Sequence, residues 1–192
     1  MTTKAHDVDK AQMFAEVRHA GQLYAEEAPY TVHLRNVVEV LKRFGVTDPA
    51  MVCAAWLHDS VEDTNTSYGD IEKRFGHDVA ELVYAVTSEL GRNRKERNAK
   101  TYPKIKCNVD ATILKLADRI ANVEYGAANG GKNDMYAKEF PDFFKGIADA
   151  GGGETVMRMW SHVAKLLGYT LARETMMVYN GKIISNPMKE SF

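Results

Sequence analysis

PAMVCAAWLHDSVEDT, residues 49–64, joins an apolar helical pattern to a cluster of ionisable side chains. Its first part, residues 49–57, is apolar and predicts a buried helix. The next six positions contain one histidine and three acids, namely His58, Asp59, Glu62 and Asp63. Packing cannot explain so many titratable groups directly after an apolar helix, because buried charges need partners. The stretch therefore marks a candidate functional site.

The rest of the chain also follows a helical period. Asp48 before Pro49 is a good N-cap and first-turn pair, and Gly45 and Gly76 are typical helix stops. Strand-like alternation is nearly absent. We therefore predict an all-α fold, a helical bundle with short loops. The helical segments are VVEVLKRF (37–44), PAMVCAAWLHDSVED (49–63), DIEKRF (70–75), DVAELVYAV (78–86), ATILKLADRIANVEY (111–125) and ETVMRMWSHVAKLLG (154–168).

Length and composition indicate one globular domain over residues 1–192, with 45% hydrophobic and 27% charged residues. Lys and Arg total 25 against 26 Asp and Glu, so no overall field attracts nucleic acid or an anionic membrane. The polar N-terminus and the lack of a long apolar run predict a cytoplasmic protein without membrane partners. Cys53 and Cys107 lack the spacing of a thiolate zinc site or a disulfide framework.

Two regions toward the C-terminus differ in composition from the helical segments before them. Seven of the 14 glycines fall within residues 126–153, which predicts an irregular, glycine-rich loop region. The helix that follows carries an apolar stripe around Trp160 that is more typical of a core than of a cofactor site. Asn180-Gly181 is a turn signal, so residues 154–192 are expected to form a helix and then a short hairpin or a tail.

The acidic residues that follow residue 57 indicate a bound cation. On a continuing helix His58 and Glu62 are four apart, as are Asp59 and Asp63, so these side chains can cluster. Clustered carboxylates repel one another unless a positive charge lies among them. A divalent metal ion is an economical solution, because imidazole and carboxylate groups are both ligands for it.

Two other segments supply polar residues of the same kinds. Asp118 and Asn122 interrupt the apolar face of residues 111–125, one helical turn apart. His33 stands just ahead of an apolar helical pattern at residues 37–41. Taken alone, a histidine in that place is more often a core or capping residue than a ligand.

Together these residues resemble the HD phosphohydrolase superfamily, whose pattern is a histidine, a His-Asp pair and a distant aspartate. More closely, they resemble the hydrolase domain of the RelA/SpoT homologues and the small alarmone hydrolases, strongest over residues 14–125. That branch carries Gly-Gln, Pro-Tyr, Glu-Asp-Thr and a KLADR…N segment. The matching residues are Gly21-Gln22, Pro29-Tyr30, His33, His58-Asp59, Glu62-Asp63-Thr64, and Lys115 to Arg119 with Asn122.

The resemblance implies a metal-dependent hydrolase. Manganese is the favoured ion, although the site chemistry leaves iron, zinc and nickel open. Glu62 and Asp63 would position or deprotonate the attacking water. The implied metal ligands are His33, His58, Asp59 and Asp118.

The implied reaction removes the 3′-pyrophosphate of (p)ppGpp, giving GDP or GTP and pyrophosphate. Its partner is thus a small phosphorylated nucleotide. Asn122 would contact the nucleoside, and Arg94 would face the phosphates from the basic run 92–106, whose ordinary interpretation is a solvated helix face. Tyr24 could stack on the base, and Tyr125 stands near the nucleotide where many relatives have a small hydroxyl residue.

One departure from the family opens alternatives. Relatives usually carry an Arg-Lys-Ser-like triplet where this chain has Tyr24-Ala25-Glu26, so phosphate pairing from this loop is lost. A different phosphorylated nucleotide, or a dinucleotide such as NADPH, is the second hypothesis. A non-enzymatic domain that binds a nucleotide or a protein is the third. Nucleic-acid binding through residues 92–106 is disfavoured, because Tyr102 is the only interleaved aromatic residue. The oligomeric state stays open.

Overall fold

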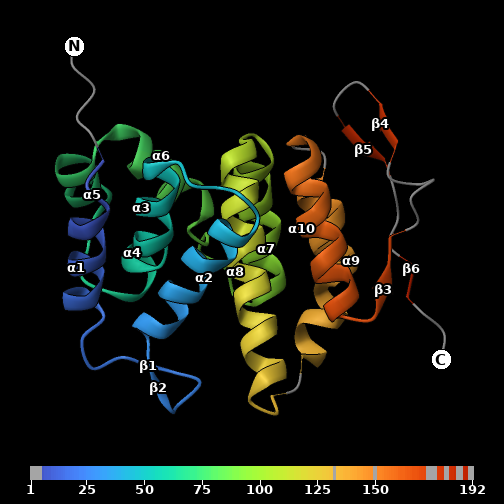
Figure 1. Ribbon diagram of the computed structural model, residues 1–192, viewed down its shortest axis with the longest axis horizontal. Helices are drawn as coiled ribbons and strands as arrows, with labels where there is room; N and C mark the ends of the chain where they lie inside the picture. Colours follow the sequence, from blue (N-terminus) through green and yellow to red (C-terminus); the bar gives the residue numbers. More distant parts are fainter. Residues whose placement is uncertain are drawn as a thin grey trace. The chain divides into compact units, whose positions relative to one another are not determined.

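The apolar stretch that begins at Pro49 forms the buried centre of the first of two units, Met1–Ser88 and Glu89–Phe192. The computed structural model describes residues 6–131, 133–148, 151–171, 177–179, 182–184 and 188–189. Helices dominate both units (Figure 1), which confirms the all-α prediction. The first unit contains α1 (Val8–Arg18), β1 (Leu23–Tyr24), β2 (Ala28–Pro29), α2 (Thr31–Arg43), α3 (Pro49–Leu57), α4 (Ser60–Asp63), α5 (Tyr68–Phe75) and α6 (His77–Val86).

Helix α3 is buried on all sides from Met51 to Leu57, because α1, α2 and α6 all pack against it. Its start follows the sequence signals: a carboxylate oxygen of Asp48 accepts the amide hydrogen of Met51 at 3.0 Å, and Pro49 occupies the first turn. Helix α5 in turn packs on α6. In the first unit, helices thus surround one apolar helix, α3, and the His-Asp pair follows directly after the C-terminal end of α3.

The helix predicted to continue through Asp63 is interrupted in the structure. Helix α3 ends at Leu57 and α4 begins at Ser60. In a continuous helix the carbonyl of Ala55 would accept the amide of Asp59, whereas here it accepts a hydrogen bond from Nδ1 of His58 at 2.8 Å. The continuing-helix prediction for this segment is therefore wrong, and a turn orients the His-Asp pair.

The second unit is built around the long helix α8. Its elements are α7 (Arg94–Lys106), α8 (Val109–Ala128), α9 (Asp134–Ile147), α10 (Gly153–Leu166), β3 (Tyr169–Thr170), β4 (Met177–Tyr179), β5 (Lys182–Ile184) and β6 (Met188–Lys189). Helices α7 and α10 pack against α8, and α9 packs against α7. The ring of Trp160 on α10 lies 4.9 Å from Phe144 and 5.2 Å from Phe143 of α9, centroid to centroid. The stripe around Trp160 is thus core, as predicted.

The prediction of a loop over residues 126–153 is wrong. Helix α8 extends to Ala128, and α9 occupies most of the remainder. An apolar face with three- and four-residue spacing outweighs the glycines there, because it packs into the core of the unit. Those buried residues are Phe140, Phe143, Phe144 and Ile147. Gly130 and Gly151 lie in the connections with positive φ angles of 68° and 82°.

The C-terminal hairpin is confirmed by the pairing of β4 with β5, which are antiparallel with Met177 opposite Ile184. The expected turn at Asn180-Gly181 lies outside the described residues. Strand β3 pairs with β6 in a second short ladder. Within the described part of the chain, no helix combines the length and the apolar character that crossing a bilayer requires.

Candidate functional site

Three atoms suited to metal binding converge in the first unit. His33 lies in the first turn of α2, His58 follows α3, and Asp59 precedes α4. The Nε2 atoms of the two histidines are 3.3 Å apart, and Oδ2 of Asp59 lies 3.0 Å from Nε2 of His58 and 3.4 Å from Nε2 of His33. The rings of His33 and His58 are buried, at 2% and 1% exposure. The structure thus brings together three of the four predicted ligands within one unit.

The orientation of His58 fits a metal ligand. Its Nδ1 donates to the carbonyl of Ala55 at 2.8 Å, so in the neutral ring the lone pair belongs to Nε2, which faces His33 and Asp59. Histidines that bind metals characteristically donate their other ring N–H to a carbonyl or a carboxylate. Two imidazole nitrogens beside a carboxylate oxygen suit a divalent first-row transition metal.

Tyr30 holds the carboxylate of Asp59. Its hydroxyl donates to Oδ2 at 2.7 Å. Burial raises the pKa of Asp59, but the neighbouring rings of His58 and His33 outweigh burial and keep that pKa well below its ordinary value. Burial, with the charges of Asp59 and Asp63, raises the pKa of Tyr30, so its phenol stays protonated as a donor. No role for the Tyr30 side chain was predicted from the sequence, although Tyr30 lies one turn before His33.

The predicted catalytic acids are each anchored through one oxygen. Oε2 of Glu62 accepts the backbone amide of Ser88 at 2.8 Å. Oδ2 of Asp63 accepts from the amide nitrogen of Gln22 at 3.2 Å, and Oε1 of Gln22 lies 2.7 Å from Nδ1 of His19. Both acids are exposed on the short helix α4. Their carboxylates therefore have fixed directions at a solvent-accessible edge.

Two aromatic contacts lie beside the candidate ligands of the first unit. The buried His19 ring stacks on Tyr30 with centroids 4.8 Å apart, which links the support of Asp63 to that of Asp59. His19 was not predicted from the sequence as a residue of the site. The ring of Tyr24 lies 5.0 Å from that of His33. It precedes a turn in which Ala25 and Glu26 both have positive φ, 52° and 66°.

In the second unit, α8 positions Asp118 and Asn122. Asp118 is 9% exposed. The amide nitrogen of Asn122 donates to Oδ1 of Asp118 at 2.6 Å, and Nζ of Lys115 lies 2.8 Å from Oδ2. Lysine and asparagine, one turn to either side, thus orient a buried carboxylate. Tyr125 follows on α8, half-buried and three residues beyond Asn122.

Arg94 is held by a carboxylate that the sequence did not reveal. Its Nε donates to Oε1 of Glu139 at 2.5 Å, and burial, which lowers the pKa of Arg94, is outweighed by this partner. The other oxygen of Glu139 lies 3.4 Å from Nη1 of the buried Arg119, whose guanidinium stacks over Phe143 at 4.3 Å and Tyr136 at 4.7 Å. Glu139 had no detectable signal, because its segment was expected to be a loop.

Comparison with known proteins identifies the family that the sequence motifs resemble. Residues 11–153 match the family model described as an HD domain. The guanosine-3′,5′-bis(diphosphate) 3′-pyrophosphohydrolase of Aquifex aeolicus is 38% identical over 128 residues, which are 62% of this chain and 18% of that relative. The MESH1 enzyme of the same name from Xenopus tropicalis is 36% identical over 127 residues, 64% of this chain and 71% of that relative.

A solved structure is similar as well. It belongs to a metazoan orthologue of SpoT that hydrolyses ppGpp and plays a role in starvation responses. The match has a TM-score of 0.69 at 26% identity and covers 88% of this chain and 99% of the other. The similarity therefore extends over nearly the whole of a protein whose reaction is known.

Proposed function

This chain belongs to the HD-domain family, and on that premise we propose that it hydrolyses the 3′-pyrophosphate of (p)ppGpp, giving GDP or GTP and pyrophosphate. The observation that carries the proposal is the convergence of His33, His58 and Asp59. The substrate is supported by the relatives from Aquifex and Xenopus and by the metazoan structure. We propose further that residues 1–192 work as a single hydrolase domain, because the family model spans parts of both units.

A divalent metal is suggested by the family and by the donor types, and we propose Mn²⁺ as the ion. Two imidazoles and two carboxylates form a mixed nitrogen and oxygen set that suits it. When bound, a divalent ion supplies Lewis acidity toward phosphoryl groups and lowers the pKa of water. The proposed ligands are His33, His58, Asp59 and Asp118.

The acids on α4 would handle the water. We propose that Glu62 and Asp63 orient the attacking water and accept its proton. Support comes from their anchoring: the amide of Ser88 holds Glu62, and Gln22 holds Asp63. A base fixed in direction loses less freedom in the transition state, which favours proton transfer.

Four residues are proposed to bind the nucleotide. Asn122 uses its amide nitrogen to hold Asp118, so its amide oxygen is the group proposed to meet the nucleoside. Arg94 uses Nε to bind Glu139, and its Nη nitrogens are proposed to bind phosphate. Tyr24, beside the ring of His33, would stack on the base, and Tyr125 would border the nucleotide.

A second candidate substrate follows from the turn after Tyr24. Glu26 is exposed there and would repel a phosphate that the cations of relatives attract. NADPH carries fewer phosphates than ppGpp, so such a dinucleotide, or another phosphorylated nucleotide, is the second candidate. The ratio of kcat/KM for ppGpp to that for NADPH separates the two candidates.

The test uses Mn²⁺-loaded protein with and without a chelator, and measures release of pyrophosphate from ppGpp and pppGpp and release of inorganic phosphate from NADPH. We expect chelator-sensitive release from ppGpp. Glu62→Gln and Asp63→Asn should each lower kcat about 10²- to 10³-fold while bound metal is retained. Lys145→Gln, an exposed change on α9, is the matched control and should leave turnover unchanged. Intact ppGpp in the presence of bound metal would contradict the proposed substrate.

A further inference from the structure

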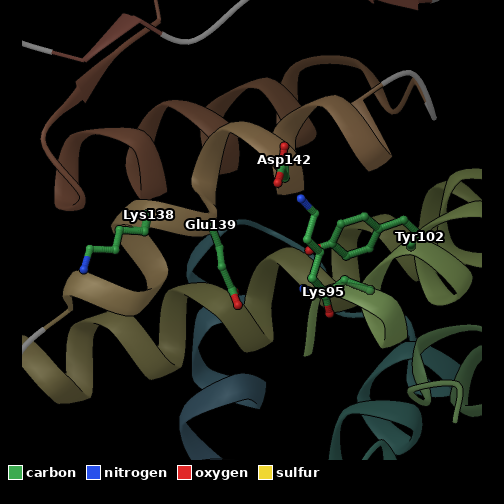
Figure 2. Close-up of a pocket in the computed structure, with 7 residues that line it drawn as sticks. Lys95, Tyr102, Lys138, Glu139 and Asp142 are labelled. Carbon is green, nitrogen blue, oxygen red and sulfur yellow. The ribbon is translucent and has the colours of Figure 1, made fainter. Parts of the chain in front are cut away.

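A pocket of about 370 Å³ lies in the second unit, between α7 and α9. Figure 2 shows Lys95 and Tyr102 on one wall and Lys138, Glu139 and Asp142 on the other. Ala99 of α7 also lines it. Its size is that of an ordinary small-molecule site. None of the proposed metal ligands or nucleotide contacts lines it.

The phenol of Tyr102 is the first sign that this pocket receives a ligand. The residue is 8% exposed, and its buried hydroxyl has no hydrogen-bond partner among the described residues. The ring is confined as well, because a Cβ atom at Gly146 of α9 would collide with it. A buried hydroxyl without a partner is costly in a folded protein. A polar ligand atom in the pocket would offset that cost.

A backbone carbonyl is the second sign. Pro103 lies inside α7 and has no amide hydrogen, so the carbonyl of Ala99 lacks its regular helical donor. In α9, Pro141 likewise leaves the carbonyl of Ala137 without its helical donor. The hydroxyl of Tyr169 replaces that donor, at 2.8 Å from the carbonyl oxygen of Ala137. Among the described residues no side chain donates in this way to Ala99. The wall formed by α7 therefore offers both a donor and an acceptor.

The charges of the pocket define what would fit. Glu139 is already engaged by Arg94 and Arg119. Lys95, Lys138 and Asp142, in contrast, form no ion pair with any residue in the described ranges. Two cations and one anion on exposed residues are thus available to a ligand, and a complementary ligand carries two negative groups and one positive group.

We propose that the pocket between α7 and α9 binds an acidic α-amino acid. Its two carboxylates would pair with Lys95 and Lys138, and its ammonium group with Asp142 and the carbonyl of Ala99. One carboxylate would also accept the hydrogen bond of the Tyr102 hydroxyl. Glu139 connects the pocket to Arg94, but no proposed metal ligand or catalytic acid lines the pocket, so the proposal does not depend on the hydrolase chemistry.

The test is isothermal titration calorimetry of the full chain with L-glutamate, L-aspartate, glutarate and inorganic phosphate. We expect binding of one amino acid per chain. Glutarate, which lacks the ammonium group, should bind at least about tenfold more weakly. If glutarate or phosphate bound as tightly as the amino acids, the site would be a general anion site and the proposal would be wrong. The proposal would also be wrong if neither amino acid bound.

Two variants and two controls locate the site. Tyr102→Phe removes only the hydroxyl, and Asp142→Asn removes only a surface charge, so both should fold. Each is expected to weaken amino-acid binding about tenfold or more. Lys145→Gln, an exposed residue of α9 outside the pocket, should bind normally. His58→Gln should also bind normally, which keeps this result independent of the hydrolase. Unchanged binding in both pocket variants would place the amino acid elsewhere and contradict the proposal.

Discussion

The polar cluster of the first unit and that of the second unit accommodate buried polar groups in opposite ways. Around Glu139, a carboxylate lies between two guanidinium groups, those of Arg94 and Arg119. At the His-Asp pair, two ring nitrogens lie 3.3 Å apart beside a carboxylate, and all three atoms are of the kinds that bind metals. The charges of the second cluster come from the chain itself. The first is composed as a ligand set, so we expect it to depend on an ion taken from solution.

The largest expected effect is the loss of that ion. His58→Gln should remove bound metal and lower turnover about 10³-fold, because a metal contributes several kcal/mol to the stabilisation of the transition state. Mn²⁺ should raise the melting temperature of the unaltered chain and fail to raise that of the variant. Metal analysis and thermal melts with and without Mn²⁺ measure both effects.

His77→Gln is the matched control for this prediction. The side chain of His77 is largely exposed, and its ion-pair partner among the described residues is Glu72, at 3.0 Å. Its replacement should leave metal content and turnover unchanged. Metal retained by His58→Gln at the level of this control would contradict the assignment of the cluster as a ligand set.

The next effect should appear in stability rather than in metal binding. Glu139→Gln leaves the guanidinium of Arg119, which is 4% exposed, without its carboxylate. Because Glu139 itself is 21% exposed, we expect a loss of about 2 kcal/mol in the free energy of unfolding, less than for a fully buried pair. Urea denaturation measures it. Lys145→Gln, the control, should change the free energy of unfolding by less than about 0.5 kcal/mol. If Lys145→Gln lost as much stability as Glu139→Gln, the loss could not be assigned to the ion pair.

The contrast also explains what the sequence could predict. His58 and Asp59 are adjacent in the chain and follow an apolar helix, so their chemistry was visible in a single stretch. The start of α3 was equally visible, because Asp48 and Pro49 act through local hydrogen bonds and dihedral angles. Local physics determines these features, and reading the sequence is enough to recover them.

Glu139 and His19 were missed for a different physical reason. Glu139 meets Arg94 across 45 positions and Arg119 across 20, so its role depends on the packing of α9, a helix that the glycine count obscured. His19 acts through stacking on Tyr30, a contact created by the return of the chain through a short hairpin turn. Neither contact follows from spacing or composition.

A smaller effect tests how the first unit supports its acids. Gln22→Ala removes the amide that joins His19 to Asp63, so the carboxylate loses its fixed direction. We expect kcat for ppGpp to fall about tenfold, with KM and metal content unchanged. Gln12→Ala is the matched control, because among the described residues the side chain of Gln12 bonds to Glu16 within the same helix, α1. A fall in metal content with kcat would instead assign Gln22 a structural role.

The smallest effect concerns the turn beside the ligand set. Glu26 has a φ of 66°, a region that side chains other than glycine adopt at a cost. Glu26→Gly should therefore raise the free energy of unfolding by about 1 kcal/mol. Glu27 is outside that region, so Glu27→Gly should lower stability instead, through added freedom of the unfolded chain. Urea denaturation of the two variants gives opposite signs if backbone strain is the cause. A gain in both would instead assign the effect to the loss of the negative charge that both variants remove.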